Sequence, residues 1–317
     1  MRRQKYVNLD AQAGVFFENE LESVKAKTYD VIYPELLARK LIPLDSSADS
    51  GAETVSYYTW DHVGMAKLIH SYATDLPAVN VTAKKTTREI YSMGVSFGYS
   101  LQDIRAARYA NKPLDQKMAN AARRQMLQLE NKIAWHGNSA SGVPGTDIPP
   151  FINNSNVNAV TIATGAGGST QWTAKTPDEI ITDISQMTST IRSISNGVEI
   201  GTRLMIPEEQ YTHIATTPRS STSDTTILDF VLKSNPWINS IVPNYELSGA
   251  APAGGYDGTD CAILYNPSPD KLTLEVPQDT EFLSVQENGL MYSVPVHQRT
   301  AGTIIYYPKS IAQANGV

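Results

Sequence analysis

Cysteine is nearly absent from this sequence: Cys261 is the single one among 317 residues. No disulfide can form within the chain, so its fold does not depend on an oxidising compartment. Cys261 stands in the apolar run CAILY. A role as a nucleophile would need a distant histidine to approach it, whereas free cysteine is among the most buried residue types. We therefore expect Cys261 to be a small residue of the core.

Charged residues are also scarce, at 18% of the chain against about a quarter in typical soluble proteins. A surface that is polar without being heavily charged suits a chain that packs against other copies of itself. The charge is unevenly placed: residues 1–137 contain 18 Lys and Arg against 15 Asp and Glu (+3), and residues 138–317 contain 8 against 17 (−9). Such halves favour head-to-tail contact between copies, and neither is basic enough to read a nucleic-acid sequence.

Long apolar runs are missing. No stretch approaches the ~20 apolar residues of a membrane span, and no apolar segment follows the basic start MRRQK as it would in a signal peptide. We therefore expect no membrane partner and synthesis in the cytoplasm. The basic start could touch phosphates non-specifically, although a solvated charged terminus explains it equally well.

Chemical motifs are sparse too. The loop TGAGGST (164–170) lacks the Gly-Lys-Ser/Thr ending of a phosphate cradle, and the pair Asp257 and Asp260 matches no calcium loop. The five histidines are not at metal-ligand spacing; they are His62, His70, His136, His213 and His297. Unless folding brings distant residues together, we predict no catalytic residue, no cofactor and no metal.

The most regular pattern lies in residues 111–137, NKPLDQKMANAARRQMLQLENKIAWHG. Apolar residues recur there every three or four positions, which predicts one long helix with a single apolar stripe. Pro113 suits the first turn, and Gly137 suits the left-handed conformation that ends a helix. Pro113 to His136 would span about 36 Å. The pattern indicates a long helix with a structural role.

Before that helix, residues 1–50 have the character of an arm that prolines interrupt, and Glu53–Trp60 and Thr86–Tyr99 are two β-prone runs. We interpret Glu53–Phe97 as a long two-stranded excursion with an elaborate tip. An isolated hairpin of this size is at best marginally stable in water. We therefore expect it to rest on a neighbouring molecule.

The remaining pattern predicts a mixed α+β chain. Ser100 and Asp103 form a capping arrangement that opens a short helix, LQDIRAARYA. Further helices are expected at Pro177–Ser195, Pro207–Ala215 and Thr225–Lys233. Strands are expected at Thr202–Ile206, Ile238–Tyr245, Cys261–Tyr265, Leu272–Val276, Glu281–Gln286, Met291–Gln298 and Thr303–Tyr307.

Taken in order along the chain, several segments resemble the major capsid proteins of tailed bacteriophages with the Hong Kong 97-type fold. The resemblance rests on VSFGYSLQDIRAARYANKPLD (95–115), ENKIAWHG (130–137) with SGVPG (141–145), and the closing VPVHQRTAGTIIYYP (294–308). No single motif is diagnostic; the order of the segments covers nearly the whole chain.

The resemblance implies a domain plan. Residues 1–52 would be the N-terminal arm, 53–97 the extended E-loop, and 98–149 with 269–317 the peripheral domain, whose spine helix is 111–137. Residues 150–268 would form the axial domain. The E-loop would lie over an adjacent subunit, and the residues we expect at that contact are Trp60, Lys67, His70, Tyr72 and Arg88.

The implied function is an icosahedral phage head, self-assembled through pentamers and hexamers around double-stranded DNA that is held non-specifically. Its other partners would be a portal at one vertex and a separate scaffolding or decoration protein. A fused, highly charged leader is not evident, and we do not predict covalent crosslinking. Two alternatives stay open: an encapsulin-like nanocompartment shell, which shares the fold, and a monomeric α/β hydrolytic enzyme.

Overall fold

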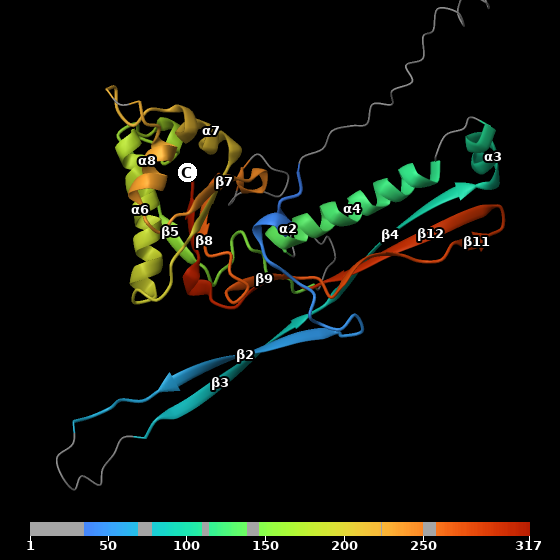
Figure 1. The fold of residues 1–317 in the computed structure, drawn as a ribbon, viewed down its shortest axis with the longest axis horizontal. Helices are drawn as coiled ribbons and strands as arrows, with labels where there is room; N and C mark the ends of the chain where they lie inside the picture. The colour runs from blue at the N-terminus through green and yellow to red at the C-terminus, as the bar shows by residue number, and fades with distance from the viewer. Residues whose placement is uncertain (1–34, 69–77, 110–113, 138–145, 223, 250–257) are drawn as a thin grey trace, which may run out of the picture. The chain divides into compact units, whose positions relative to one another are not determined.

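The computed structural model describes residues 35–68, 78–109, 114–137, 146–222, 224–249 and 258–317. The chain divides into two units, residues 1–35 and 36–317, and the elements below belong to the second (Figure 1). Its α-helices are α2 (Ala38–Leu41), α3 (Leu101–Tyr109), α4 (Leu114–His136), α6 (Pro177–Ile194), α7 (Glu208–Thr216) and α8 (Ile227–Ser234). Single 3₁₀ turns are η1 (Trp172–Ala174), η2 (Tyr245–Leu247) and η3 (Pro308–Ser310).

Within the described residues the strands form four sheets, which together with the helices confirm the α+β expectation. The first sheet has the order β1 (Leu44–Asp45), β9 (Leu272–Glu275), β13 (Gly302–Ile305). In the second, β12 (Met291–Thr300) pairs with β4 (Tyr91–Ser100) and with both β10 (Gln278–Phe282) and β11 (Gln286–Asn288). The third has the order β5 (Asn158–Thr161), β14 (Ala312–Asn315), β8 (Cys261–Tyr265), β6 (Arg203–Ile206), β7 (Ser240–Pro243). The fourth is β2 (Thr54–Val63) with β3 (Asn80–Glu89).

The long helix is confirmed as α4, which ends at His136. Gly137 follows with a φ of +52°, the left-handed conformation that glycine adopts without steric cost. Part of the apolar stripe of α4 is buried: Met126 and Ile133 pack with Met93 of β4 and Val296 of β12. The expected start at Asn111–Pro113 lies outside the described residues.

The two-stranded excursion has a different second strand from the one expected. β2 pairs with β3, from Thr54 opposite Glu89 to Val63 opposite Asn80. Tyr91–Ser100 instead pairs along its whole length with β12. The prediction of one strand over Thr86–Tyr99 was therefore wrong. The strands separate at Ile90, whose buried side chain belongs to the body of the subunit. We call β2 and β3 the ribbon.

The five-stranded sheet is buried on both faces. Alternate residues of β8 point to opposite sides: Ala262 and Leu264 join the core under α6, α7 and α8, and Ile263 and Tyr265 join a second core with Trp135 of α4. Burial on both faces explains why CAILY is apolar without alternation. The sequence-based plan assigns residues 312–317 to the peripheral part, whereas β14 lies between β5 and β8 in this sheet.

Candidate intersubunit surface

The ribbon presents two unlike faces, because side chains alternate along paired strands. One face, here called the outer face, consists of Thr54, Ser56, Tyr58, Trp60 and His62 of β2 with Val81, Ala83, Lys85, Thr87 and Glu89 of β3. Every residue of this face is exposed to solvent. Tyr58 is 58% exposed, Trp60 62% and Val81 47%. Large apolar side chains that are this exposed at neighbouring positions indicate a binding surface.

The opposite face rests on the body of the same subunit near the ribbon's base. The ring of Tyr57 meets the ring of Tyr306 edge to face, with 4.9 Å between centroids. A guanidinium nitrogen of Arg88 lies 3.9 Å from the Asp147 carboxylate. These contacts orient the ribbon and leave the outer face uncovered.

The five residues expected at the intersubunit contact are placed unequally. Trp60 lies on the outer face, and Lys67 is exposed beyond the end of β2. Arg88 is on the opposite face, beside Asp147 of its own subunit. His70 and Tyr72 lie outside the described residues. Sequence reasoning omitted Tyr58 and Val81. Tyr58 is two positions from Trp60 and therefore lies on the same face of β2. Val81 joins that face through the pairing of β2 with β3, so placing it required the correct partner strand.

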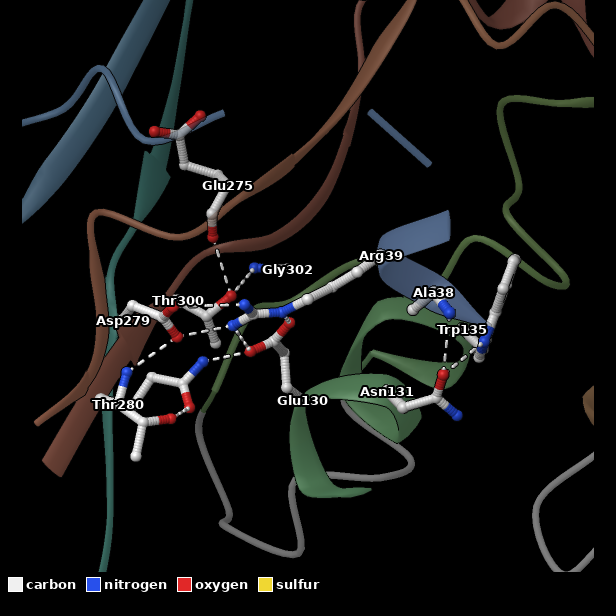
Figure 2. A network of polar contacts seen from close by, with 11 residues as sticks. Ala38, Arg39, Glu130, Asn131, Trp135, Glu275, Asp279, Thr280, Thr300 and Gly302 are labelled. Carbon is white, nitrogen blue, oxygen red and sulfur yellow. Dashed lines mark hydrogen bonds and ion pairs between the residues drawn. The ribbon is translucent and has the colours of Figure 1, made fainter. Parts of the chain in front are cut away.

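A buried polar network fixes the short helix α2 against α4 (Figure 2). Arg39 donates two hydrogen bonds to the Glu130 carboxylate, at 2.6 and 2.7 Å, and reaches Asp279 of β10 at 2.8 Å. Glu130 is 1% exposed and also accepts a hydrogen bond from Gln298 of β12. Planar two-point pairing of guanidinium and carboxylate adds directional specificity to the attraction. One arginine therefore ties together segments that are far apart in the sequence.

The next residue of α4 extends the network. Asn131 Oδ1 accepts hydrogen bonds from the Ala38 backbone (3.0 Å) and from the indole of Trp135 (3.3 Å). Its amide donates to Glu246 of η2 at 3.1 Å, and His136 lies 3.1 Å from the other oxygen of Glu246. The C-terminal half of α4 is thus joined to α2 and to η2.

A second feature is a pair of carboxylates on β1 and β9. Glu275 of β9 and Asp45 of β1 are direct partners in parallel strands. Burial first, and then the charge of Asp45, raise the pKa of Glu275 to about 7, against a hydrogen bond from the Ala48 backbone. Glu275 Oε1 has no hydrogen-bond partner. Burial, and then the same two carboxylates, raise the pKa of Tyr306, the residue on which Tyr57 rests, in spite of its hydrogen bond with Thr273.

The chemical candidates of the sequence have structural explanations. Cys261 is buried, as expected. Burial, and then the charge of Asp260, raise the pKa of its thiol, which disfavours the nucleophilic thiolate. The backbone N–H of Ala166, in the glycine-rich loop, donates to Glu179 at 2.8 Å, so a protein carboxylate occupies that donor. Asp260 accepts a hydrogen bond from the Gly249 backbone at 2.9 Å. Within the described ranges, no three His, Cys, Asp or Glu side chains gather as metal ligands would.

Comparison with known proteins identifies the family. The sequence model of the family described as "Major capsid protein" matches residues 64–317. The chain belongs to the major capsid protein family. Membership makes this capsid protein a structural component of the virion that assembles with further copies into the shell of a phage head. In the part of the chain that is described, no helix is long and apolar enough to cross a bilayer. Compared with curated proteins by sequence, the chain has no match.

Solved capsids share the fold of this major capsid protein. The capsid of Myoviridae phage XM1 is 14% identical, with a TM-score of 0.80 over 94% of this chain and 98% of that one. Mycobacterium phage Ogopogo is 15% identical, with a TM-score of 0.62 over 94% and 97%. A virus-like particle from Pyrococcus furiosus is 14% identical, with a TM-score of 0.52 over 87% and 91%. The expected Hong Kong 97-type fold is confirmed.

Proposed function

We propose that this capsid protein closes icosahedral heads through pentamers and hexamers, and that the ribbon is the strap that joins neighbouring subunits. The observation that carries the proposal is the uncovered outer face, with Tyr58, Trp60 and Val81 exposed side by side. An exposed two-stranded ribbon gains little from its own subunit. Laid over a neighbour, it buries apolar area in both copies, and contacts that close around an axis generate rings.

The domain plan follows the same proposal. Residues 1–52 are the arm, and the ribbon with its tip is the E-loop. The peripheral domain combines residues 98–149, which include the spine helix, with most of residues 269–317. Strand β4 also belongs to this domain, because it pairs with β12. Residues 150–268 form the axial domain, whose five-stranded sheet is completed by β14. The enclosed double-stranded DNA would be held through its phosphates without base reading. A portal at one vertex and a separate scaffolding or decoration protein complete the set of partners.

The experiment replaces the ribbon's tip. Val63 and Asn80 are opposite each other in register, so residues 64–79 can be exchanged for Asn-Gly, a pair suited to the two-residue turn of a hairpin. We expect folded chains that form no closed particles by electron microscopy or size-exclusion chromatography, whereas the unaltered chain does. Normal shells from the shortened chain would show that residues 64–79 are not needed for the strap. An unaltered chain that stays monomeric at high concentration, with scaffold supplied, would refute shell formation.

A nanocompartment that encloses a cargo enzyme is the second candidate, since shells of both kinds share the fold. The match to the major capsid protein family and the TM-score of 0.80 to a phage capsid support the phage head. The contents of purified particles separate the two: nuclease-protected DNA supports the head, and a stoichiometric enzyme supports the compartment. Neither the family match nor the similarity to solved structures favours the hydrolytic alternative.

A further inference from the structure

We propose that Asp45 and Glu275 bind one hard divalent cation, Mg²⁺ or Ca²⁺, between their carboxylates. We call this pair the carboxylate site. It lies where the short strand β1 pairs with β9. The inference goes beyond the proposed function, because it concerns a ligand of the single subunit and does not depend on contacts between copies.

The two side chains of the carboxylate site lie on the same face of their sheet. Asp45 is the direct partner of Glu275 in the parallel pairing of β1 with β9, and directly paired residues project to the same side. Backbone hydrogen bonds fix both positions. The Val276 N–H donates to the Asp45 carbonyl oxygen at 2.8 Å, and the Ala301 N–H donates to the Glu275 carbonyl oxygen at 3.1 Å. The strands therefore hold the two carboxylates near each other.

Glu275 has a buried polar atom that the chain leaves without a partner. The residue is 1% exposed, its carboxylate points away from the Arg39 network (Figure 2), and its Oε1 forms no hydrogen bond. In the described part of the chain, no Lys, Arg or His forms an ion pair with Asp45 or Glu275. Buried charges in proteins are paired or coordinate metals. Glu275 lacks the first kind of partner, which favours the second.

The charge of the pair favours a cation at neutral and higher pH. Burial, and then the charge of Asp45, raise the pKa of Glu275 to about 7, in spite of a hydrogen bond from the Ala48 backbone. Above that pH, two carboxylates of like charge occupy paired positions, which costs free energy. One divalent cation would balance both charges and give Oε1 the partner that the chain does not provide.

The donor atoms of the carboxylate site decide the class of cation. Within the described residues, no third His, Cys, Asp or Glu completes a metal-binding group with this pair. Two hydroxyls lie nearby: Thr273 is two positions before Glu275 on the same face of β9, and its hydroxyl is 2.9 Å from that of Tyr306. Asp45 is only partly buried, so water and ions can reach it. Carboxylates completed by neutral oxygens and water suit Mg²⁺ or Ca²⁺, whereas zinc prefers imidazole and thiolate.

Thermal unfolding of the unassembled full chain at pH 8 tests the carboxylate site. After removal of bound metal with EDTA, millimolar Mg²⁺ or Ca²⁺ should raise the melting temperature by about 2–4 °C. NaCl at equal ionic strength should not. Glu275→Gln and Asp45→Asn should each lose the shift, and Asp270→Asn, at an exposed position between β8 and β9, should keep it. A shift with one of the two ions alone supports the inference and identifies the ion. No shift in the unaltered chain, an equal shift with NaCl, or a shift that either site variant retains would overturn it.

Terbium luminescence reports where the ion binds. Tb³⁺ is a hard cation that prefers oxygen ligands, and it emits when a nearby aromatic ring transfers excitation to it. The charges of both carboxylates act on Tyr306, whose ring contacts that of Tyr57, so suitable rings are close. We expect sensitised emission from the unaltered chain and from Asp270→Asn, and several-fold weaker emission from Glu275→Gln. Emission that is absent from the unaltered chain, or that is unchanged in Glu275→Gln, would overturn the inference.

Discussion

Asp45 and Glu275 are opposite each other on the parallel strands β1 and β9, with Glu275 buried and one of its carboxylate oxygens without a hydrogen-bond partner. Two carboxylates on directly paired positions cannot both be ionised without repulsion, and burial adds a cost to the charge of Glu275. The charges of both carboxylates act on Tyr306, whose ring contacts the ring of the ribbon's Tyr57. The protonation of Glu275 therefore changes the charge near the tyrosine that the ribbon's Tyr57 contacts.

The first prediction concerns pH. The pKa of Glu275 is about 7 in the folded chain against 4.5 for the free side chain, so the folded state holds a proton that the unfolded state releases. This contribution to stability is fully present below about pH 4.5 and is lost as the pH rises through 7. Glu275→Gln removes the dependence, and at pH 8 we expect it to raise the free energy of unfolding by about 1–3 kcal/mol. Urea unfolding of the unassembled chain at pH 5 and pH 8 measures this, and an unchanged pH slope in the variant would contradict it.

The second prediction concerns Arg39. Replacing it with methionine leaves the Glu130 carboxylate buried without its ion-pair partner, which typically costs about 3–5 kcal/mol. We expect a lower urea midpoint for unfolding of the unassembled chain. Asp279→Asn is the matched control: it weakens the other half of the same arginine's pairing, but the Asp279 side chain is 62% exposed, so a loss below about 1 kcal/mol is expected. Equal losses in the two variants would argue against the importance of burial at Glu130.

The third prediction separates two costs of replacing a glycine. Gly137 has a φ of +52°, and an added Cβ would lie 2.3 Å from the Ile148 carbonyl oxygen. Gly289 has a φ of +65° with open space around it. Gly289→Ala should cost about 1 kcal/mol from the backbone conformation alone. Gly137→Ala should cost clearly more, because the backbone of 148–150 must also move. Thermal unfolding of both variants makes the comparison, and similar melting temperatures would contradict it.

The sequence predicted regular elements best where one physical rule dominates. The stripe of α4 and the capping pair Ser100 and Asp103 were correct, since helix periodicity and caps are local. The buried strand CAILY was correct because both of its faces are covered. In contrast, β3 (NVTAKKTTRE) is polar and almost wholly exposed, so no apolar alternation marks it. Its place as the partner of β2 depends on pairing with a distant segment.

The residues of the candidate surface divide in the same way, into those that local sequence indicates and those that tertiary packing brings together. Trp60 was expected at the contact because it lies in the β-prone run that the resemblance assigns to the E-loop. The Arg39–Glu130 pair and the carboxylates of Asp45 and Glu275 join positions 91 and 230 residues apart (130 − 39 and 275 − 45). β14 enters the five-stranded sheet from the end of the chain. Local spacing carries no information about such neighbours, because tertiary packing creates them.

The fourth prediction uses Trp60 as a reporter of assembly. Of the four tryptophans, Trp135 and Trp172 are fully buried, Trp237 is 36% exposed and Trp60 is 62% exposed. If the outer face is covered by a neighbour, Trp60 leaves water on assembly. Its emission should then move to shorter wavelength, and acrylamide should quench it several-fold less. Trp60→Phe should abolish most of the change, and Trp237→Phe should preserve it. A full spectral change in assembled Trp60→Phe shells would mean that the ribbon's outer face stays in solvent, and that other surfaces join the subunits.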